Sequence, residues 1–492
     1  MLAGTFLRAK EERTFESEAS TRDSALPFLC PELNLPINQS AMNDKSLNLG
    51  KGPILPLLLK MSGPSIAAML AMAVYNFIDA FWLARLSPEA IAALTICFPL
   101  QFIFGGIGVG TGIGAGSYAS RMLGAGEILK ARQTAGQVFF LSASLGFLLV
   151  GGILAAPDPI LKFFGASTEI LPLSRLYLIT TMPGVPFLFL IMMINNLLRA
   201  EGRPNASMFA VFFIAAISAI LDPLLIFGWG PFPRLEIQGA ALAAVISQIS
   251  GAALSFYYLQ QKSSKYRLRW KDLVPNPLII LSIYSTGFPS IVINLVVSFA
   301  MFLHNFILAG YSNLAVATLG IIFRTNGLIM MMLYGFGHGL MPLVGFSEGA
   351  KLYSRLMESV KIAVRISFAI ALLSCLLVEV FASPIAAFFS PDLQLHALTE
   401  TALRINFLML LTGAPSLMWI NMFIGLGRGT TAMFLLVARE TLFLIPLLFF
   451  LSSRFGINGV WMAQPLANAL AFLFILYWTK RQYRFFESQA AS

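Results

Sequence analysis

Charged residues are scarce in this 492-residue chain, in which Asp, Glu, Lys and Arg together make up only 11%. Soluble globular proteins carry about 25% charged residues, so an ordinary soluble domain is excluded. Cysteine and histidine are also rare, with three of each, and the cysteines are scattered along the chain. This spacing predicts neither a disulfide framework nor a cysteine–histidine metal site.

Several functional motifs are missing as well. No GxxxxGK[ST] run is present, so the sequence offers no phosphate loop for an ATP-driven motor. No HExxH pair or serine–histidine dyad at helical spacing occurs, and we therefore expect no enzyme activity. The net charge of +10 comes without a cluster of basic and aromatic residues, so we expect no nucleic-acid partner. No cofactor is predicted.

Hydrophobic residues, in contrast, make up 57% of the chain, and the mean hydropathy is +0.78. Many apolar stretches are about 20 residues long, which is the length that a helix needs to cross a bilayer. The stretches lack the strict alternation of a membrane barrel, so they predict an all-α polytopic membrane protein. The sequence predicts twelve transmembrane helices, at residues 54–85, 91–120, 133–157, 172–200, 206–230, 237–261, 278–310, 314–346, 358–388, 396–425, 430–452 and 458–480.

Polar segments divide these helices into two groups of six. The most polar internal segment, QQKSSKYRLRWKDLVP from Gln260, predicts a cytoplasmic linker over residues 262–277. The predicted N-terminal bundle spans 51–261, the C-terminal bundle spans 278–480, and 481–492 form a tail. Residues 1–50 are polar and lack the pattern of a signal peptide, which predicts a disordered tail. Met42 is an alternative start of translation.

Lysine and arginine are distributed unevenly between the two sets of predicted loops. About 18 basic residues lie on the side that holds the central linker and the C-terminal tail, against about five on the other side. Because basic loops stay in the cytoplasm, both termini are predicted to be cytoplasmic. The inner membrane of a bacterium is the expected location.

The two bundles are related by an internal repeat at a shift of 225 residues. Residues 64–125 align without a gap on residues 289–350, with roughly 19 of 62 positions identical. Six helices per half give both halves the same orientation, so the repeat is parallel and its axis runs along the membrane normal. Two parallel bundles around a central cavity are typical of alternating-access secondary transporters.

Several fragments of the sequence occur in a distinctive order and spacing. They include MSGPSIAAMLAMAVYNFIDAFWLARL from Met61, GTGIGAGSYASRMLGAGE from Gly110, NNLLRAEGRPNASM from Asn195, LDPLLIFGWGPFP from Leu221 and RFGINGVWMAQPLANAL from Arg454. By these fragments the chain resembles the MATE (multidrug and toxic compound extrusion) family over about residues 53–480, and is most similar to the DinF-like branch and its bacterial multidrug relatives.

This resemblance implies a multidrug exporter that exchanges amphiphilic, often cationic, drug-like compounds for H+ or Na+. Membrane lipid is the other expected partner, and we expect a monomer. The branch places its coupling aspartates in the first and fifth helices, where this chain has Asp79 and Asp222. A carboxylate inside a membrane is costly, and such residues usually mark ion or proton pathways.

Four residues form the predicted cation-coupling group. Tyr75 precedes Asp79 by one helical turn, and Ser218 precedes Asp222 by one turn. The resemblance implies a sodium site that has asparagine where this chain has Ser218 and threonine where it has Ala244. Because two oxygen ligands are weakened or lost, we favour H+ over Na+, although a sodium site at the two aspartates and Ser218 stays open.

Other side chains are predicted to line the cavity or to bend helices. Asn195 matches a family position near the drug and cation sites, and His304 occupies the position of Asp79 in the second repeat. His304 is either a cavity-lining polar residue, which we favour, or a second proton site. The remaining predicted residues are Asn76 and Gln248 for substrate, and Pro64 and Pro223 for helix bending.

A lipid-linked oligosaccharide flippase of related architecture is the alternative function. It would require a strongly cationic cavity for a pyrophosphate group. Most of the predicted cavity residues are acidic or neutral, which favours the drug exporter.

Overall fold

The computed structural model describes residues 46–389 and 392–491, and within these ranges every regular element is a helix. The predicted tail therefore lies almost wholly outside the described residues, as does Met42. The elements of the first half are α3 (Ile54–Leu86), α4 (Pro88–Gly124), α5 (Ile128–Ala155), α6 (Pro157–Phe163), α7 (Leu171–Thr181), η1 (Met182–Gly184), α8 (Val185–Ala200), α9 (Pro204–Phe227) and α10 (Glu236–Gln260).

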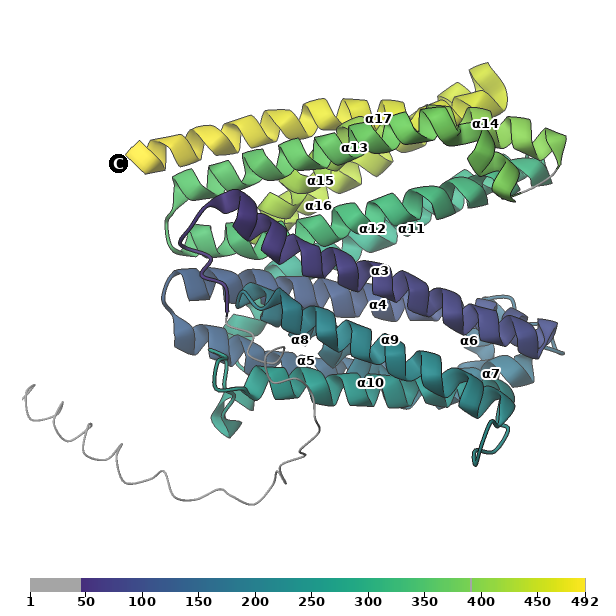
Figure 1. Ribbon diagram of the computed structural model, residues 1–492, viewed down its shortest axis with the longest axis horizontal. Coiled ribbons are helices and arrows are strands. Elements are labelled where there is room, and N and C mark those ends of the chain that lie inside the picture. The colour runs from purple at the N-terminus through teal and green to yellow at the C-terminus, as the bar shows by residue number, and fades with distance from the viewer. Residues whose placement is uncertain (1–45, 390–391, 492) are drawn as a thin grey trace, which may run out of the picture. The chain divides into compact units, whose positions relative to one another are not determined.

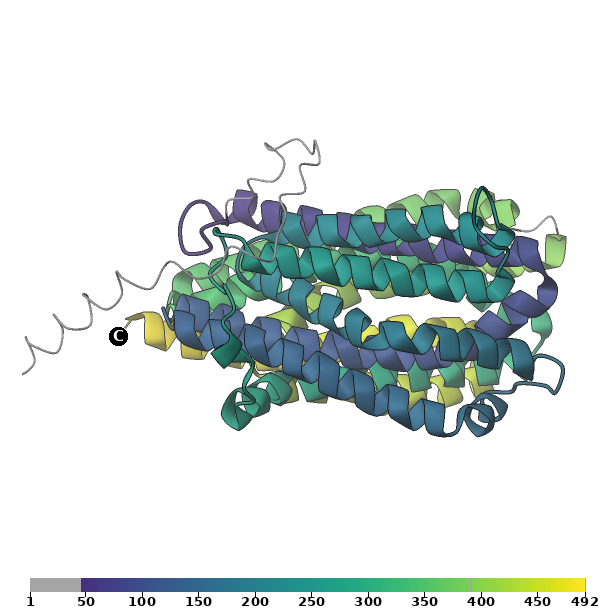
Figure 2. The same ribbon diagram turned by 90° about the horizontal axis from the view of Figure 1, so that it is seen from below.

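The second half follows after a short linker. Its elements are η2 (Trp270–Leu273) within the linker, then α11 (Pro277–Ala309), α12 (Asn313–Gly349), α13 (Tyr353–Phe389), α14 (Leu393–Phe407), α15 (Met409–Gly425), α16 (Gly429–Ala438), η3 (Arg439–Leu444) and α17 (Ile445–Ala491). The helices of the described body lie side by side along one direction (Figures 1 and 2). The beginning of α3 and the end of α17 lie at the same end of these helices (Figure 1).

The predicted twelve crossings are confirmed in the described part of the chain. Ten helices there are long and apolar enough to cross a membrane, and α14 with α15 adds an eleventh that is bent by 41°. One of the ten, Gly429–Ala490, is continuous only through Gly456, whose φ of 60° and ψ of −139° are not helical. Glycine tolerates such a backbone because it has no Cβ atom, and the chain turns there into a second crossing.

Three helix boundaries differ from the prediction. A short helix, α6, follows the third crossing, and the fourth crossing is interrupted by η1, where Pro183 removes a backbone donor. The last helix continues to Ala491 instead of ending at residue 480. Phe486 explains this extension, since its side chain is fully buried and stacks on Tyr353 of α13 with ring centroids 5.6 Å apart.

Matched glycines of the repeat lie where the two halves touch. A Cβ atom on Gly124 of α4 would lie 2.0 Å from the carbonyl oxygen of Phe346, and one on Gly349 of α12 would lie 1.9 Å from that of Arg121. The shift of 225 residues relates Gly124 to Gly349, and Arg121 to Phe346. The two contacts are therefore equivalent, as expected if a two-fold axis relates the parallel halves.

The same symmetry holds farther along these helices. Gly110 packs against Ile291 as Gly335 packs against Ile66, and both pairs keep the shift of 225 residues. We call the set of close contacts the glycine seam, defined by Gly110, Gly114 and Gly124 of α4 and by Gly335, Gly339 and Gly349 of α12. Only residues without a side chain let helix backbones approach this closely. The seam joins the halves at the end where the described chain begins and ends.

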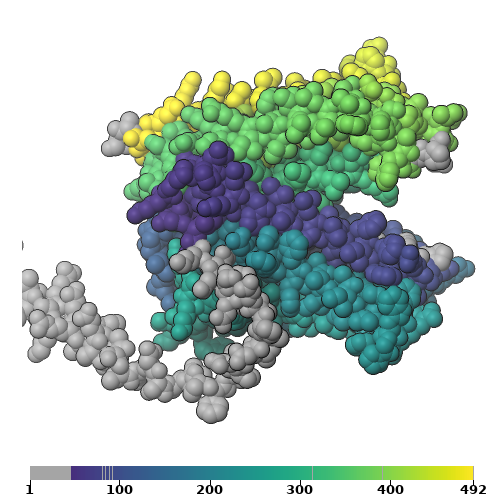
Figure 3. All heavy atoms as spheres, viewed as in Figure 1, coloured from purple at the N-terminus to yellow at the C-terminus, as the bar shows by residue number. Residues whose placement is uncertain are grey.

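The halves separate toward the other end of the helices. Figure 3 shows the body hollowed between the two halves at the end where α6, α7 and α14 lie. Large apolar side chains near that end are exposed, including Phe77 at 72%, Phe102 at 62% and Phe306 at 66%. We call the two ends the closed end and the open end.

A short irregular segment ahead of α3, which turns at Leu49 and Gly50, crosses the closed end. The amide of Leu47 donates to the carbonyl of Gly202 in the first half, at 2.9 Å. The guanidinium of Arg355 on α13, in the second half, donates to the carbonyls of Leu49, Lys51 and Gly52 at 2.8 to 3.0 Å. Residues 47–52, which we call the strap, are thus tied to both halves.

Replacing Arg355 should release the strap. We expect Arg355→Ala to cost about 2 kcal/mol locally, because three hydrogen bonds to a charged donor are lost. Amide hydrogen exchange of a peptide that covers residues 47–52 should then be about 30-fold faster. Arg365→Ala removes an exposed arginine from the same helix and serves as the control. Equal exchange in both variants would show that Arg355 does not hold the strap.

The linker between the halves is packed against the first half. Arg132 of α5 forms an ion pair with the buried carboxylate of Asp272, with a distance of 2.8 Å from Nε to Oδ2. Gln137 donates to the carbonyl of Val274 at 2.9 Å and accepts from the amide of Asn276 at 2.9 Å. Because the linker is fixed to α5, it orients the start of α11.

Candidate functional site

The predicted coupling residues meet between α3 and α9. Tyr75 and Asp79 are one turn apart on α3, and Ser218 and Asp222 are one turn apart on α9. The two helices pack against each other, and the hydroxyl of Tyr75 lies within electrostatic range of both carboxylates and close to Ser218. The structure therefore brings all four residues into one group, the acidic group of the first half.

The acids of this group have no protein counter-ion in the described part of the chain. Asp222 is fully buried, and the polar side chain nearest to its carboxylate is the buried hydroxyl of Ser218 one turn earlier. No basic side chain of the described residues pairs with Asp222. Burying an unpaired carboxylate costs several kcal/mol, so the group is suited to taking up a proton or a cation.

Arg85 was the nearest basic residue in sequence to Asp79, but its guanidinium is engaged elsewhere. It lies 4.3 Å from the centre of the Phe81 ring and 5.8 Å from that of Trp82. Such cation–π contacts hold the arginine on the aromatic face. No ion pair between Arg85 and Asp79 occurs among the described residues.

The structure adds two residues that the sequence did not indicate. Tyr177 of α7 is buried and lies within electrostatic range of Asp79 and Tyr75. Its hydroxyl accepts a hydrogen bond from Nε2 of Gln101 on α4, at 3.1 Å. Because Gln101 and Tyr177 lie on different helices, 76 residues apart, no local pattern marks them.

The other predicted residues of the first half lie in different places. Asn195 is buried on α8, and its Oδ1 atom has no hydrogen-bond partner among the described residues. Gln248 of α10 lies over the backbone of Gly184, and its Oε1 atom is unpartnered in the described part of the chain. Asn76 is exposed on α3.

Both predicted hinge prolines lie inside helices that continue through them. Pro64 lies in α3, and Pro223 lies in α9 directly after Asp222. Proline donates no hydrogen bond, so the carbonyl of Ala219 loses its helical partner one turn before Pro223. This leaves a backbone oxygen without its helical partner in the turn that holds Ser218 and Asp222.

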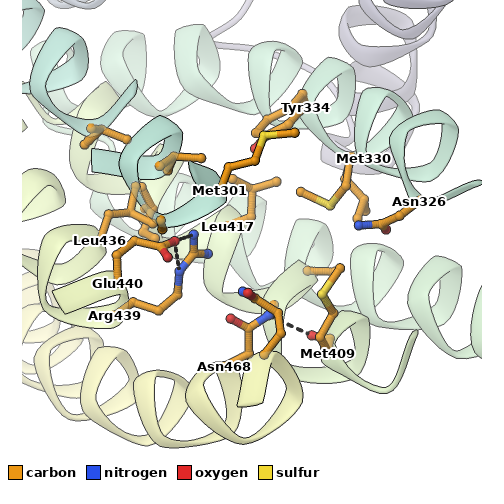
Figure 4. A pocket seen from close by; sticks show the side chains of 18 of the residues that line it. Met301, Asn326, Met330, Tyr334, Met409, Leu417, Leu436, Arg439, Glu440 and Asn468 are labelled. Carbon is orange, nitrogen blue, oxygen red and sulfur yellow. Dashed lines mark hydrogen bonds and ion pairs between the residues drawn. The ribbon is translucent and has the colours of Figure 1, made fainter. Parts of the chain in front are cut away.

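The second half holds a cavity of about 520 Å³. His304 of α11 lines it, as predicted for a cavity-lining residue, together with Asn326 and Tyr334 of α12 and Asn468 of α17. Methionines supply much of the apolar wall, among them Met301, Met330 and Met409 (Figure 4). Met69, Val109 and Ile113 of the first half also contribute to the lining. Flexible thioethers suit a site that accepts ligands of different shape.

An arginine and a glutamate form an ion pair in this cavity. Arg439 and Glu440 are the first residues of η3, a π-helical turn between α16 and α17. Nε of Arg439 donates to Oε1 of Glu440 at 2.9 Å, and Nη2 donates to the same oxygen (Figure 4). Glu440 is buried, and both His304 and Tyr334 lie within electrostatic range of it. The sequence shows the two residues side by side but not the π turn.

Comparison with known families gives two matches along the chain. The family described as MatE matches residues 64–224 and again residues 289–450. From residue 64 to residue 289 the distance is 225 residues, the same as the shift of the internal repeat. The family model therefore covers most of the chain and recognises each half separately.

Individual relatives agree with this result. The chain is 28% identical to the multidrug export protein MepA of Staphylococcus aureus (strain MSSA476) over 434 residues, which cover 87% of this chain and 94% of that protein. It is similar to a solved MATE structure in the bent conformation, with a TM-score of 0.85 at 24% identity, covering 90% of this chain and 98% of the other. An outward-facing multidrug resistance MATE transporter gives a TM-score of 0.83 at 24% identity, with 89% and 98% covered.

Proposed function

Because this chain belongs to the MatE family of membrane transporters, we propose that it is a secondary exporter of small amphiphilic, often cationic, compounds. Export is driven by inward movement of H+, with Na+ as the second candidate. The closest support is the acidic group of the first half, where a fully buried Asp222 lies beside Asp79 without a described counter-ion. A multidrug exporter at 28% identity over nearly its whole length supports the substrate class.

The two aspartates carry the coupling in this proposal. When a proton or cation binds, it neutralises part of the buried charge and stabilises the group; its release to the other side resets the group. Tyr75, Ser218 and Tyr177 are positioned to share a proton with the carboxylates or to supply oxygens to a cation. One proton moving down 100 mV supplies about 2.3 kcal/mol, enough for roughly a 50-fold gradient of a neutral substrate.

The choice of H+ over Na+ follows from the oxygen ligands. Sodium must replace its water shell with several oxygens, whereas a proton needs one basic atom. The serine at residue 218 and the alanine at residue 244 offer fewer oxygens than the site implied by the family resemblance. We therefore expect the pH gradient to be the driving force.

The closed and open ends fit one step of an alternating-access cycle. In this proposal the closed end and both termini are cytoplasmic, which is supported by the excess of basic residues in the loops on the side of the central linker and the C-terminal tail. The hollow between the halves then faces outward (Figure 3). Pro64 and Pro223 are the proposed positions at which α3 and α9 bend when the aspartates are protonated.

Substrate contacts residues of both halves in this proposal. Asn195, Asn76 and Gln248 serve the first half and His304 the second. The arginine of the second-half cavity is already paired with Glu440, so that cavity lacks the strong positive charge that a pyrophosphate requires. This favours drug export over the lipid-linked oligosaccharide flippase. We expect the protein to act as a monomer in the bacterial plasma membrane.

Reconstituted vesicles test this function directly. Purified protein is placed in liposomes with a fluorescent cationic dye, and either a pH gradient or a Na+ gradient is imposed while valinomycin and potassium clamp the voltage. We expect a pH gradient to drive dye movement at constant Na+, and a Na+ gradient at constant pH to drive none. Movement under the Na+ gradient alone would assign sodium coupling, and movement equal to that in protein-free vesicles under both gradients would reject the proposed export.

A further inference from the structure

The two halves differ in the charge that they present to a ligand. In the first half, Asp79 and Asp222 have no basic partner among the described residues. In the second half, His304 stands in place of Asp79, and the buried acid is Glu440, which lies seven residues before the counterpart of Asp222, or about two turns. Glu440 has a guanidinium beside it, so the second site carries no net charge.

The ion pair of the second half is only partly satisfied by protein atoms. Both contacts from Arg439 end on Oε1 of Glu440. Within the described ranges, Oε2 of Glu440 and Nη1 of Arg439 have no hydrogen-bond partner of their own. A carboxylate accepts several hydrogen bonds and a guanidinium donates five, so each partner keeps bonding capacity for a ligand.

The backbone around the pair also departs from the repeat. The corresponding helix of the first half, α9, is α-helical throughout, whereas η3 is a π turn that begins at Arg439. A π turn holds one extra residue and is frequently found at functional sites. Both side chains line the cavity, together with the neutral polar groups of Asn326 and Asn468, whose Oδ1 atoms are buried and unpartnered in the described part of the chain.

We propose that this cavity binds zwitterionic amphiphiles, with the ligand's ammonium group on Glu440 and its acid group on Arg439. A ligand that carries both charges meets a free acceptor and a free donor and leaves the net charge of the site unchanged. A purely cationic ligand would satisfy Glu440 but leave Arg439 facing a positive charge in a poorly hydrated cavity. The volume of about 520 Å³ suits a drug-sized molecule, and the methionines contact its apolar part.

This inference deepens the proposed export function, but its test requires no ion gradient. Rhodamine 110, a zwitterion near neutral pH, and its cationic methyl ester, rhodamine 123, differ by one methyl group and form a matched pair of probes. Binding of each dye to the purified full chain in detergent is measured by fluorescence anisotropy, and Asp79→Asn/Asp222→Asn protein is used to remove cation binding in the first half. We expect at least a tenfold preference for the zwitterion.

The double variant Arg439→Gln/Glu440→Gln removes both charges together and avoids leaving one unpaired charge buried. In the same Asp79→Asn/Asp222→Asn background, we expect this double variant to bind the two dyes equally, so that the ratio of their affinities falls to about one. The affinity for the ester should not change. If the double variant does not fold, Arg439→Lys is tested in its place. It keeps the positive charge but loses the paired donors of the guanidinium, and should lower the preference for the zwitterion partially. Arg404→Gln/Glu400→Gln removes another arginine–glutamate pair of the second half, which does not line the cavity, and is the matched control. The inference would be overturned if protein with Arg439 and Glu440 intact bound both dyes equally, or if the double variant kept the preference for the zwitterion. Failure of gradient-driven efflux would concern the export function alone.

Discussion

Asp222→Asn is expected to reduce proton-driven dye efflux at least tenfold while the protein stays folded. Asparagine has nearly the shape of aspartate, but its side chain does not titrate near neutral pH and carries no negative charge for a cation. Because Asp222 is fully buried and has no basic partner among the described residues, removing its charge also removes a desolvation cost. The melting temperature should therefore stay level or rise. The measurements are efflux from proteoliposomes under a pH gradient and a thermal melt in detergent.

Asp79→Asn should give the same loss of efflux, since Asp79 belongs to the same group. Asp158→Asn is the matched control, because Asp158 is a half-exposed acid of the first half that pairs with Arg175 at 3.4 Å, far from this group in the chain. Efflux at the unaltered rate by Asp222→Asn protein would remove Asp222 from the coupling mechanism. A large drop in melting temperature would instead indicate a structural role for the carboxylate.

Gly114→Val should force the closed end apart. A Cβ atom on Gly114 would lie 2.2 Å from the carbonyl oxygen of Ile283, and backbone atoms of α11 cannot move aside as a side chain can. Overpacking of this kind costs up to about 3 kcal/mol, which would change the ratio of closed to open forms of this end by roughly 100-fold. We expect faster maleimide labelling of a cysteine placed at Ser117, which is buried against the carbonyl of Ile424 at 2.6 Å.

The labelling requires a background without the native cysteines Cys30, Cys97 and Cys375. Gly105→Val is the control on the same helix, because a Cβ atom at Gly105 meets nothing within 4 Å. If the cysteine at Ser117 stays unreactive in folded Gly114→Val protein, the seam does not determine closure.

The lengths of the apolar stretches were enough to predict the twelve crossings, and the family resemblance pointed to the two aspartates of the acidic group. Asp79 and Asp222 are polar residues in long apolar stretches, and their one-turn neighbours follow from the 3.6-residue helical period. The positions of Tyr177 and Gln101 could not be predicted, because their contact depends on how three helices pack. The repeat identified equivalent glycines, but equivalence does not say which residue each one touches, so the seam emerged only from the structure.

The local backbone conformation could not be predicted from the sequence either. The π turn at Arg439 has no composition that distinguishes it from the α-helical turns around it. The open and closed ends could not be assigned either, since a cycling transporter uses the same residues in both arrangements. By contrast, the extension of α17 to Ala491 has a visible cause in retrospect, because Phe485 and Phe486 make the predicted tail partly apolar.

The strap limits how far the two halves can move apart at the closed end. The amide of Leu47 is bonded to Gly202 of the first half, and the carbonyl of Leu49, two residues farther on, is bonded to Arg355 of the second half. The two residue steps between these attachments span about 7 Å when fully extended. While both attachments hold, the strap acts as a mechanical stop: the stroke ends when it is taut, and a wider opening requires one anchor to let go.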